Sequence, residues 1–95
     1  MKIASEEEKL ERIATAFCSI KSAEECKMLL RDLCTLSEIT AMAERLTIAQ
    51  KVSENKSYRT IALETGTSTA TITRVAHWLH HGTGGYSLVL ERLKK

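Results

Sequence analysis

Polar and apolar residues along this 95-residue chain alternate with the period of an α-helix, and no stretch shows the alternation of a strand. Near the start, Ser5 and three glutamates precede an apolar face, as expected where acidic side chains meet the positive end of a helix. That face consists of Leu10, Ile13, Ala14, Phe17 and Ile20. The pattern predicts a first helix within residues 5–21 and an all-α fold.

Two further helices are predicted where a hydroxyl residue precedes a glutamate by three positions, the spacing of a capping box. These pairs are Ser22 with Glu25 and Thr35 with Glu38. The second helix has an apolar face of Cys26, Leu29, Leu30 and Leu33. In the third we expect Ile39, Met42, Ala43, Leu46, Ala49 and Val52 to face inward. The third helix should end near residues 54–56.

Residues 57–79 have the pattern of a helix-turn-helix. Ser57 is suited to cap its first helix, in which we expect Ile61, Ala62 and Leu63 to face inward. Gly66 follows, and glycine adopts the left-handed backbone of a tight helix exit without steric penalty. The small side chain of Ala62 would let the two helices cross closely.

The second helix of this motif should begin at Thr67 or Ser68. Its buried stripe is predicted at Ile72, Val75 or Ala76, and Leu79. The opposite face consists of Thr69, Ala70, Thr73, Arg74 and His77. Hydroxyl donors, a methyl surface and a cation on one free face are what a recognition helix presents to the major groove.

These residues predict binding to double-stranded DNA, with separate roles for two groups of side chains. Phosphate contacts are expected from Lys56, Ser57, Arg59 and Thr71, together with the helix starts. The sequence preference is expected from Thr69, Ala70, Thr73 and Arg74. An ordinary helical hairpin would share the helix-glycine-helix order, but Ile61, Ala62, Gly66, Ile72 and Val75 together favour the DNA-binding motif.

Beyond the motif, residues 80–85 form a glycine-rich break, followed by a last helix with Tyr86, Val89, Leu90 and Leu93. The chain should therefore form a single domain, residues 1–95, of about six helices. With 43 % hydrophobic residues, it carries more apolar surface than one small chain readily covers. An intertwined homodimer would cover that surface.

Charge and cysteine content indicate which part of the domain faces its partner and in which compartment the protein lies. The net charge is only +2, yet residues 1–34 are slightly acidic and residues 35–95 basic, so the second part should face the nucleic acid. Three cysteines without a signal peptide indicate reduced thiols in the cytoplasm. No stretch approaches the apolar length of a membrane span.

Over about two-thirds of its length, residues 29–93, the chain resembles the Trp repressor family. The run from Ala70 to Arg74 is similar to that family's recognition-helix signature, and residues 33–48 resemble the segment before its motif. The resemblance implies a homodimeric regulator that reads a palindromic operator, most simply as a repressor. It places Ser68, Thr69, Ala70, Thr71 and Thr73 at bases and phosphates, and Arg59 at a guanine.

The resemblance also implies an effector pocket, in which Arg45 and Arg74 would enclose the indole of tryptophan and Thr35 would contribute a hydroxyl. This chain departs from the founding member at two positions. Val75 replaces a glycine that leaves room for the indole, and Trp78 replaces a serine that meets the ligand's amino group. We expect these two side chains largely to fill the pocket and Trp78 to stand in for the ligand, so that no cofactor is needed. An effector other than tryptophan is the alternative.

Other constellations carry weaker signals. His77, His80 and His81 lie at helical spacing but without an acid or cysteine to complete a metal site, and Cys18, Cys26 and Cys34 lie beside apolar stripes as buried thiols often do. No phosphate-binding glycine loop or nucleophile elbow is present, so we predict no enzymatic activity. A helical module that binds a partner protein remains the main rival to DNA binding.

Overall fold

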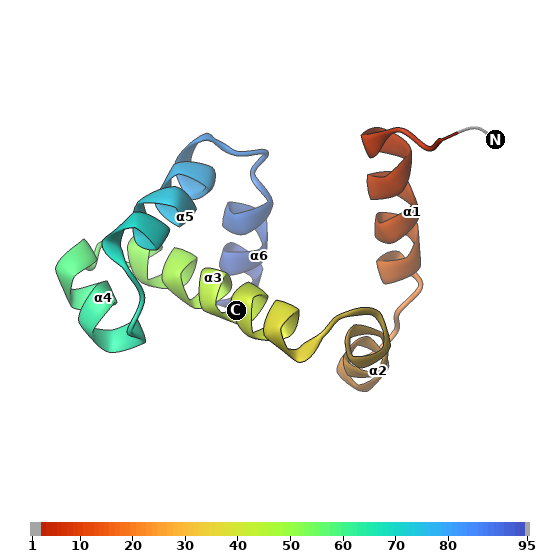
Figure 1. The fold of residues 1–95 in the computed structure, drawn as a ribbon, viewed down its shortest axis with the longest axis horizontal. Coiled ribbons are helices and arrows are strands. Elements are labelled where there is room, and N and C mark those ends of the chain that lie inside the picture. The colour runs from red at the N-terminus through yellow and green to blue at the C-terminus, as the bar shows by residue number, and fades with distance from the viewer. Residues whose placement is uncertain (1–2, 95) are drawn as a thin grey trace. The chain divides into compact units, whose positions relative to one another are not determined.

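A computed structural model describes residues 3–94, which form six helices and no strand. The helices are α1 (Glu6–Cys18), α2 (Ala23–Leu33), α3 (Leu36–Ser53), α4 (Tyr58–Thr65), α5 (Thr69–His81) and α6 (Gly85–Leu93) (Figure 1). The all-α prediction is confirmed. Contacts within the chain group these helices into two compact units, of which the first ends at Ile39 and the second begins at Thr40.

In the first unit, side-chain caps begin each helix where the sequence predicts. Ser5 and Glu8 form a reciprocal capping box at α1, with distances of 3.1 and 3.2 Å between the capping oxygens and backbone nitrogens. Thr35 and Glu38 do the same at α3. These bonds satisfy amide groups that a helix start otherwise leaves without partners.

The cap of α2 differs from the predicted box in one respect. Ser22 accepts a hydrogen bond from the backbone nitrogen of Glu25 at 3.1 Å, as expected. The Glu25 carboxylate, however, accepts from the backbone nitrogen of Lys21 at 2.9 Å, one residue before the position a capping box requires. Only the serine half of the predicted box is present.

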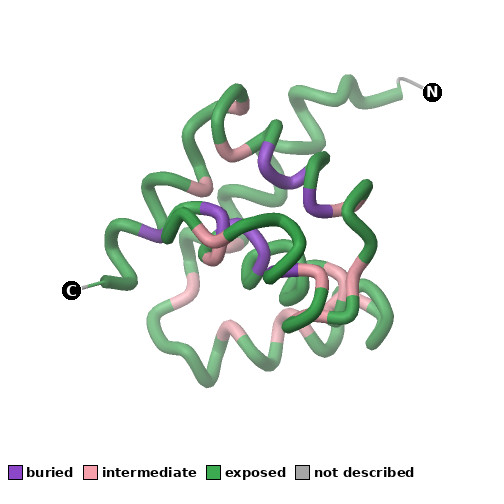
Figure 2. Tube along the Cα trace, turned by 90° about the vertical axis from the view of Figure 1, so that its left-hand side faces the viewer, coloured by how far each residue is buried: buried purple, intermediate pink, exposed green. Residues whose placement is uncertain are grey.

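Burial divides the two units sharply, as the tube in Figure 2 illustrates. No residue of α1 or α2 is buried, and Leu10 and Ile13 of the predicted first face are 68 % and 49 % exposed. The second unit contains all eight buried residues: Ile48, Ala49, Val52, Ile61, Ile72, Val75, Ala76 and Leu90. The described residues therefore contain one core.

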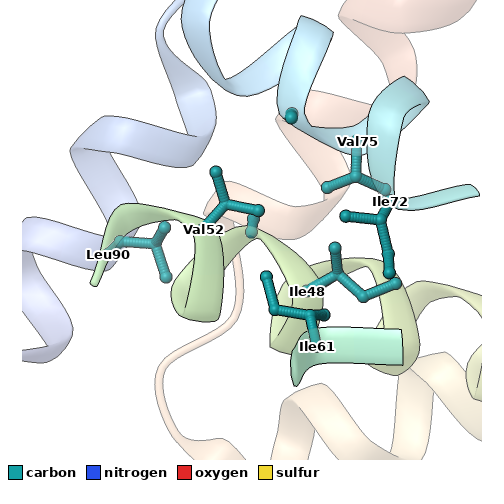
Figure 3. Close-up of a cluster of buried hydrophobic side chains, with 8 residues drawn as sticks. Ile48, Val52, Ile61, Ile72, Val75 and Leu90 are labelled. Atoms are coloured by element: carbon teal, nitrogen blue, oxygen red, sulfur yellow. The ribbon is translucent and has the colours of Figure 1, made fainter. Parts of the chain in front are cut away.

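This core lies where α4, α5 and α6 pack around the C-terminal half of α3 (Figure 1). Figure 3 shows Ile48 of α3 beside Ile61 of α4 and Ile72 of α5, and these are the largest side chains that are fully buried. Removing this much apolar surface from water is the main stabilising contribution available to so small a unit.

The predicted inward face of α3 is wrong at three of its six positions. Met42 and Leu46 are each 37 % exposed and Ala43 is also exposed, whereas Ile48, absent from the predicted face, is fully buried. Residues two apart on a helix point about 200° apart, so Leu46 and Ile48 lie on opposite sides of α3. The helix carries apolar residues on both sides, and only one side meets the core.

Corrections of the same kind apply to α4, α5 and α6. Leu63, predicted to face inward, is 80 % exposed, because Ile61 two positions earlier takes the buried side of α4. Leu79 is half-buried rather than buried, whereas Val75 and Ala76 are both buried. In α6 only Leu90 is buried; the remaining positions of its predicted face are Tyr86, half-buried, and Val89 and Leu93, exposed.

Candidate nucleic-acid interface

The helix-turn-helix forms where the sequence predicts it. Ser57 caps α4 by accepting from the backbone nitrogen of Thr60 at 3.1 Å. Gly66 ends α4 with a left-handed φ of 72°, and its nitrogen donates to the carbonyl of Ala62 at 2.9 Å. Ser68 then caps α5. The predicted cap of α4 and the glycine exit are confirmed. Helix α5 begins at Thr69, one residue after the predicted start, and it extends to His81, two residues into the predicted break.

Two threonines, one on each side of Gly66, stabilise the turn. The sequence analysis did not predict this role for them. The Thr65 hydroxyl donates to the carbonyl of Ile61 at 2.7 Å and lies 2.7 Å from the Thr67 hydroxyl. The backbone nitrogen of Thr67 donates to Thr65 Oγ1 at 3.3 Å. The two hydroxyl residues beside the predicted glycine exit could have indicated these hydrogen bonds, because such side chains often bond to the backbone of a turn.

The recognition helix α5 separates its side chains as predicted. Ile72, Val75 and Ala76 are at most 2 % exposed and hold the helix against the core. The residues predicted for its free face are all exposed: Thr69, Ala70, Thr73, Arg74 and His77. The buried stripe thus fixes how α5 is rotated, and a polar face carrying one guanidinium is left free.

Hydroxyl groups at the start of α5 are partly committed to the protein itself. Ser68 Oγ accepts from the backbone nitrogen of Thr71 and lies 3.1 Å from the Thr71 hydroxyl. Thr73 Oγ1 donates to the carbonyl of Thr69 at 2.8 Å. A hydroxyl that donates within the protein has no hydrogen left for a ligand, so Thr73 cannot donate to DNA while it bonds to Thr69.

Lys56, predicted to contact phosphate, forms an ion pair with Glu64 of α4 at 3.3 Å. Lys51 of α3 approaches the same carboxylate at 2.9 Å. Hydrogen bonds first from Lys51 and then from Lys56 lower the pKa of Glu64, and the bond to Glu64 raises the pKa of Lys51. The sequence reading missed Lys51 and Glu64, because 13 residues separate them and no local spacing connects them. This triad ties α4 to the end of α3, and a phosphate would compete with Glu64 for Lys56.

Two further predicted phosphate contacts, one of them a cation, are accessible. Arg59 is exposed in the first turn of α4, and Ser57 is exposed at its cap. Together with the free face of α5, they give this surface positive charge and hydrogen-bond donors, which suit phosphate oxygens and the acceptor-rich edges of guanine.

The second unit has a cavity of about 350 Å³ lined by residues of α3, α5 and α6. Four of the five predicted pocket residues line it: Arg45, Arg74, Val75 and Trp78. Ala41, Glu44, Thr71 and Tyr86, which the sequence reading did not assign to it, complete the lining. Thr35 is absent from the lining.

Val75 and Trp78 do not fill this cavity, contrary to our expectation. Val75 is 2 % exposed and belongs to the core, so its side chain adds to the lining without occupying the space. Trp78 lies three residues further along α5 and is 57 % exposed. Trp78 therefore borders an open space that Arg45, Arg74 and Glu44 also line.

Histidines and cysteines add little to the site. The rings of His77 and His81 have centroids 5.2 Å apart, but within residues 3–94 no group of three His, Cys, Asp or Glu side chains is arranged to hold a metal ion. Cys18, Cys26 and Cys34 are free thiols. No helix in the described part of the chain is long and apolar enough to cross a membrane.

Comparison with known proteins identifies the family of this chain. The family model of the Trp repressor protein matches residues 8–94. The chain belongs to the Trp repressor family. Membership indicates a DNA-binding regulator and places the chain among regulators rather than enzymes.

Relatives in this family share both sequence and fold. The chain is 41 % identical over 86 residues to the uncharacterized protein YerC of Bacillus subtilis, covering 90 % of this chain and 83 % of that protein. A crystal structure of a TrpR-like protein from Eubacterium eligens aligns with a TM-score of 0.83 at 38 % identity, covering 90 % of this chain and 89 % of the other. A Staphylococcus aureus protein described as a candidate Trp repressor gives a TM-score of 0.83 at 36 % identity, with 90 % and 86 % covered.

Proposed function

We propose that this protein is a transcriptional repressor that binds a palindromic operator as a homodimer in the cytoplasm. The observation that carries the proposal is the division of α5: Ile72, Val75 and Ala76 anchor one side while the opposite side, from Thr69 to His77, is exposed. A helix so fixed presents one defined set of side chains to a major groove. Family membership supports the same function.

Exposed apolar side chains support the homodimer. Outside the core, large hydrophobic residues are exposed on α1, α2, α3 and α6, among them Leu10, Ile13, Met28, Leu33, Leu36, Met42, Leu46, Leu88, Val89 and Leu93. A monomer rarely exposes this much apolar surface, and a second copy of the chain would bury it. In the dimer, the whole chain would act as one domain, and two recognition helices would meet successive major grooves about one helical turn apart.

Two groups of contacts account for binding in this proposal. Arg59, Ser57, Lys56, Ser68 and Thr71 contact the phosphate backbone, with Lys56 leaving Glu64 to do so. A second group reads base edges and consists of Thr69, Ala70, Thr73 and Arg74, with His77 beside them. Phosphate contacts should fix the register of the protein on the duplex, and base contacts should set its sequence preference.

Variants of one residue from each group test this assignment. Arg74→Ala should cost about 1–3 kcal/mol on the preferred duplex and relax discrimination at one base pair. Arg59→Ala should weaken binding to all sequences, unless this arginine also reads a guanine, and Lys56→Ala should weaken all sequences alike and reduce the slope of affinity against salt by about one. Fluorescence anisotropy on specific and scrambled duplexes at several salt concentrations separates these outcomes.

The rival function, a helical module that docks on a partner protein, predicts a different response to salt. Contacts that neutralise phosphates lose affinity steeply as salt is added, whereas apolar docking does not. If the wild-type protein binds no duplex at low salt, the DNA-binding assignment fails and the interaction module is favoured.

A second candidate function, gating by a small effector, is favoured by the cavity. About 350 Å³ is enough for a small molecule, and a lining with two arginines, one glutamate, Trp78 and Tyr86 suits a charged group joined to an apolar body. Because Arg74 belongs both to this lining and to the exposed face of α5, an effector would alter how that face is presented. Calorimetry with L-tryptophan and with other aromatic acids tests this gating, and no heat of binding from any of them would contradict it.

A further inference from the structure

One hydroxyl on the recognition helix is already used by the protein. Thr73 is exposed on the free face of α5, yet its Oγ1 donates to the carbonyl of Thr69 at 2.8 Å, within the ordinary range of an O–H···O hydrogen bond. A threonine hydroxyl has a single hydrogen to donate. While this bond is made, Thr73 has no hydrogen for a ligand.

That restriction excludes most polar partners on DNA. Phosphate oxygens and the O6 and N7 atoms of guanine only accept hydrogen bonds, so Thr73 has nothing to donate to them. Its oxygen retains an acceptor lone pair, and the other branch on Cβ is a methyl group. Because Oγ1 is held towards the backbone of its own helix, the methyl is the branch left to meet a groove.

A second methyl lies on the same part of the helix. Ala70 precedes Thr73 by three residues, which places the two side chains on neighbouring turns of one helix face, and both are exposed. In the major groove, thymine alone among the four bases of DNA presents a C5 methyl group, and apolar contact with that methyl distinguishes it from the other bases.

We propose that Thr73, supported by Ala70, is a specificity-determining residue that reads a thymine methyl group by apolar contact rather than by a hydrogen bond. This inference rests on the proposed DNA-binding function and adds the chemistry of one base position to it. It predicts that each operator half-site contains a thymine whose methyl group is required by Thr73.

Two substitutions at one position separate the methyl from the hydroxyl. Thr73→Val keeps the methyl and removes the hydroxyl, whereas Thr73→Ser keeps the hydroxyl and removes the methyl. The Thr69 carbonyl still accepts the backbone hydrogen bond of the helix in both variants, so neither is left without a partner. Thr15→Ser makes the same change on exposed α1 and serves as the matched control.

The DNA can be altered in the complementary way. In the duplex that the wild-type protein selects, each thymine is replaced singly by deoxyuridine, which lacks only the C5 methyl. For the wild type, one such replacement should weaken binding about fourfold per half-site, the value expected for one lost methyl contact. Thr73→Ser removes the methyl from both protomers, so on the unmodified duplex it should lose about fourfold at each half-site, or about sixteenfold in all. Thr73→Val should bind within about twofold of the wild type.

The two losses should not add. Thr73→Ser should bind the unmodified and the deoxyuridine duplex equally at that position, because it no longer has a methyl to make the contact, while Thr15→Ser should respond as the wild type does. Circular dichroism of each variant checks that the helices remain intact.

Opposite results would overturn the inference without touching DNA binding itself. If Thr73→Val loses affinity and Thr73→Ser does not, Thr73 acts through its oxygen, for example by accepting from adenine N6 or cytosine N4. Indifference of the wild type to every deoxyuridine replacement would also contradict the inference. Absence of any selected duplex would instead refute the proposed function.

Discussion

The two units of this chain form their helices by similar local means but differ in what they bury. Helices α1 and α2 begin with serine caps as α4 and α5 do, yet no residue of α1 or α2 is buried, whereas α4 and α5 contribute four of the eight core residues. Capping and periodicity define a helix locally, and burial needs a partner surface. The second unit finds its partner surface within the chain, and the first exposes an apolar face that a second copy would cover.

The largest expected effect comes from the core of the second unit. Ile61→Ala should lower the free energy of unfolding by about 2–5 kcal/mol, because Ile61 is 0 % exposed and its loss leaves a cavity. Ile13→Ala is the matched change in the first unit, where the side chain is 49 % exposed.

The stability effects of these two variants should depend differently on protein concentration. In urea unfolding at concentrations below dimerisation, Ile13→Ala should change stability by no more than about 1 kcal/mol, and its effect should grow as the dimer forms. The effect of Ile61→Ala should be large at every concentration. A large, concentration-independent effect of Ile13→Ala would show that the first unit has a core of its own.

A charge on the exposed face of the first unit should break the dimer. Leu36 is 63 % exposed at the first position of α3, where an acidic side chain suits the helix dipole. Leu36→Glu should therefore leave the folded chain intact but raise the dimer dissociation constant at least about tenfold, because the interface would have to bury a carboxylate.

Leu63→Glu on α4 is the control for this change, since Leu63 is 80 % exposed on the other unit. Analytical ultracentrifugation should give the wild-type dissociation constant for Leu63→Glu. Equal weakening by both variants would contradict the assignment of the interface to the face that includes Leu36.

The turn of the second unit depends on one backbone conformation. Gly66 has φ of 72°, and a Cβ there would meet no atom within 4 Å, so the cost of a side chain is conformational rather than steric. Gly66→Ala should lower the midpoint of unfolding by an amount corresponding to about 1–2 kcal/mol, and Gly66→Asn by less, because asparagine tolerates the left-handed region better. Equal losses for the two variants would argue that the space around residue 66 matters more than its backbone.

The smallest effect concerns acid stability, and each unit has one carboxylate that tests it. Hydrogen bonds from Thr35 lower the pKa of Glu38, and hydrogen bonds from Lys51 and Lys56 lower that of Glu64. A carboxyl whose pKa is lower in the folded state contributes stability that is present above its unfolded pKa, about 4.3, and that is lost as the pH falls through the folded value.

Replacing either carboxylate by an amide should flatten that acid transition. Glu38→Gln and Glu64→Gln should each lose stability less steeply than the wild type on acidification below about pH 4.3, as followed by circular dichroism. Glu91→Gln on exposed α6 is the control. Curves for Glu64→Gln that fall as steeply as the wild type would argue that the triad with Lys51 and Lys56 is not maintained in solution.

Features determined by neighbours in sequence could be predicted, and those determined by distant contacts could not. The caps at Ser57 and Ser68, the exit at Gly66 and the exposed face of α5 follow from residues within a few positions of one another. The triad of Lys51, Lys56 and Glu64 joins separate elements, and no local pattern indicates it.

The face of α3 shows a second limit of prediction. Met42 and Leu46 on one side and Ile48 with Val52 on the other are equally apolar, so periodicity identifies both sides but not which one meets the core. The cavity has a related difficulty. Its lining was predicted at Arg45 and Arg74, but whether Trp78 occupies or borders the space depends on how its side chain is oriented.

The most direct test of the central claim is selection of bound sites from random duplex DNA by the purified protein, with and without L-tryptophan. Our account predicts that one palindromic sequence, with half-sites about one helical turn apart, is enriched. Enrichment only with tryptophan would show that the cavity beside Trp78 takes the amino acid. Failure to enrich any sequence in either condition would contradict the assignment of α5 as a recognition helix.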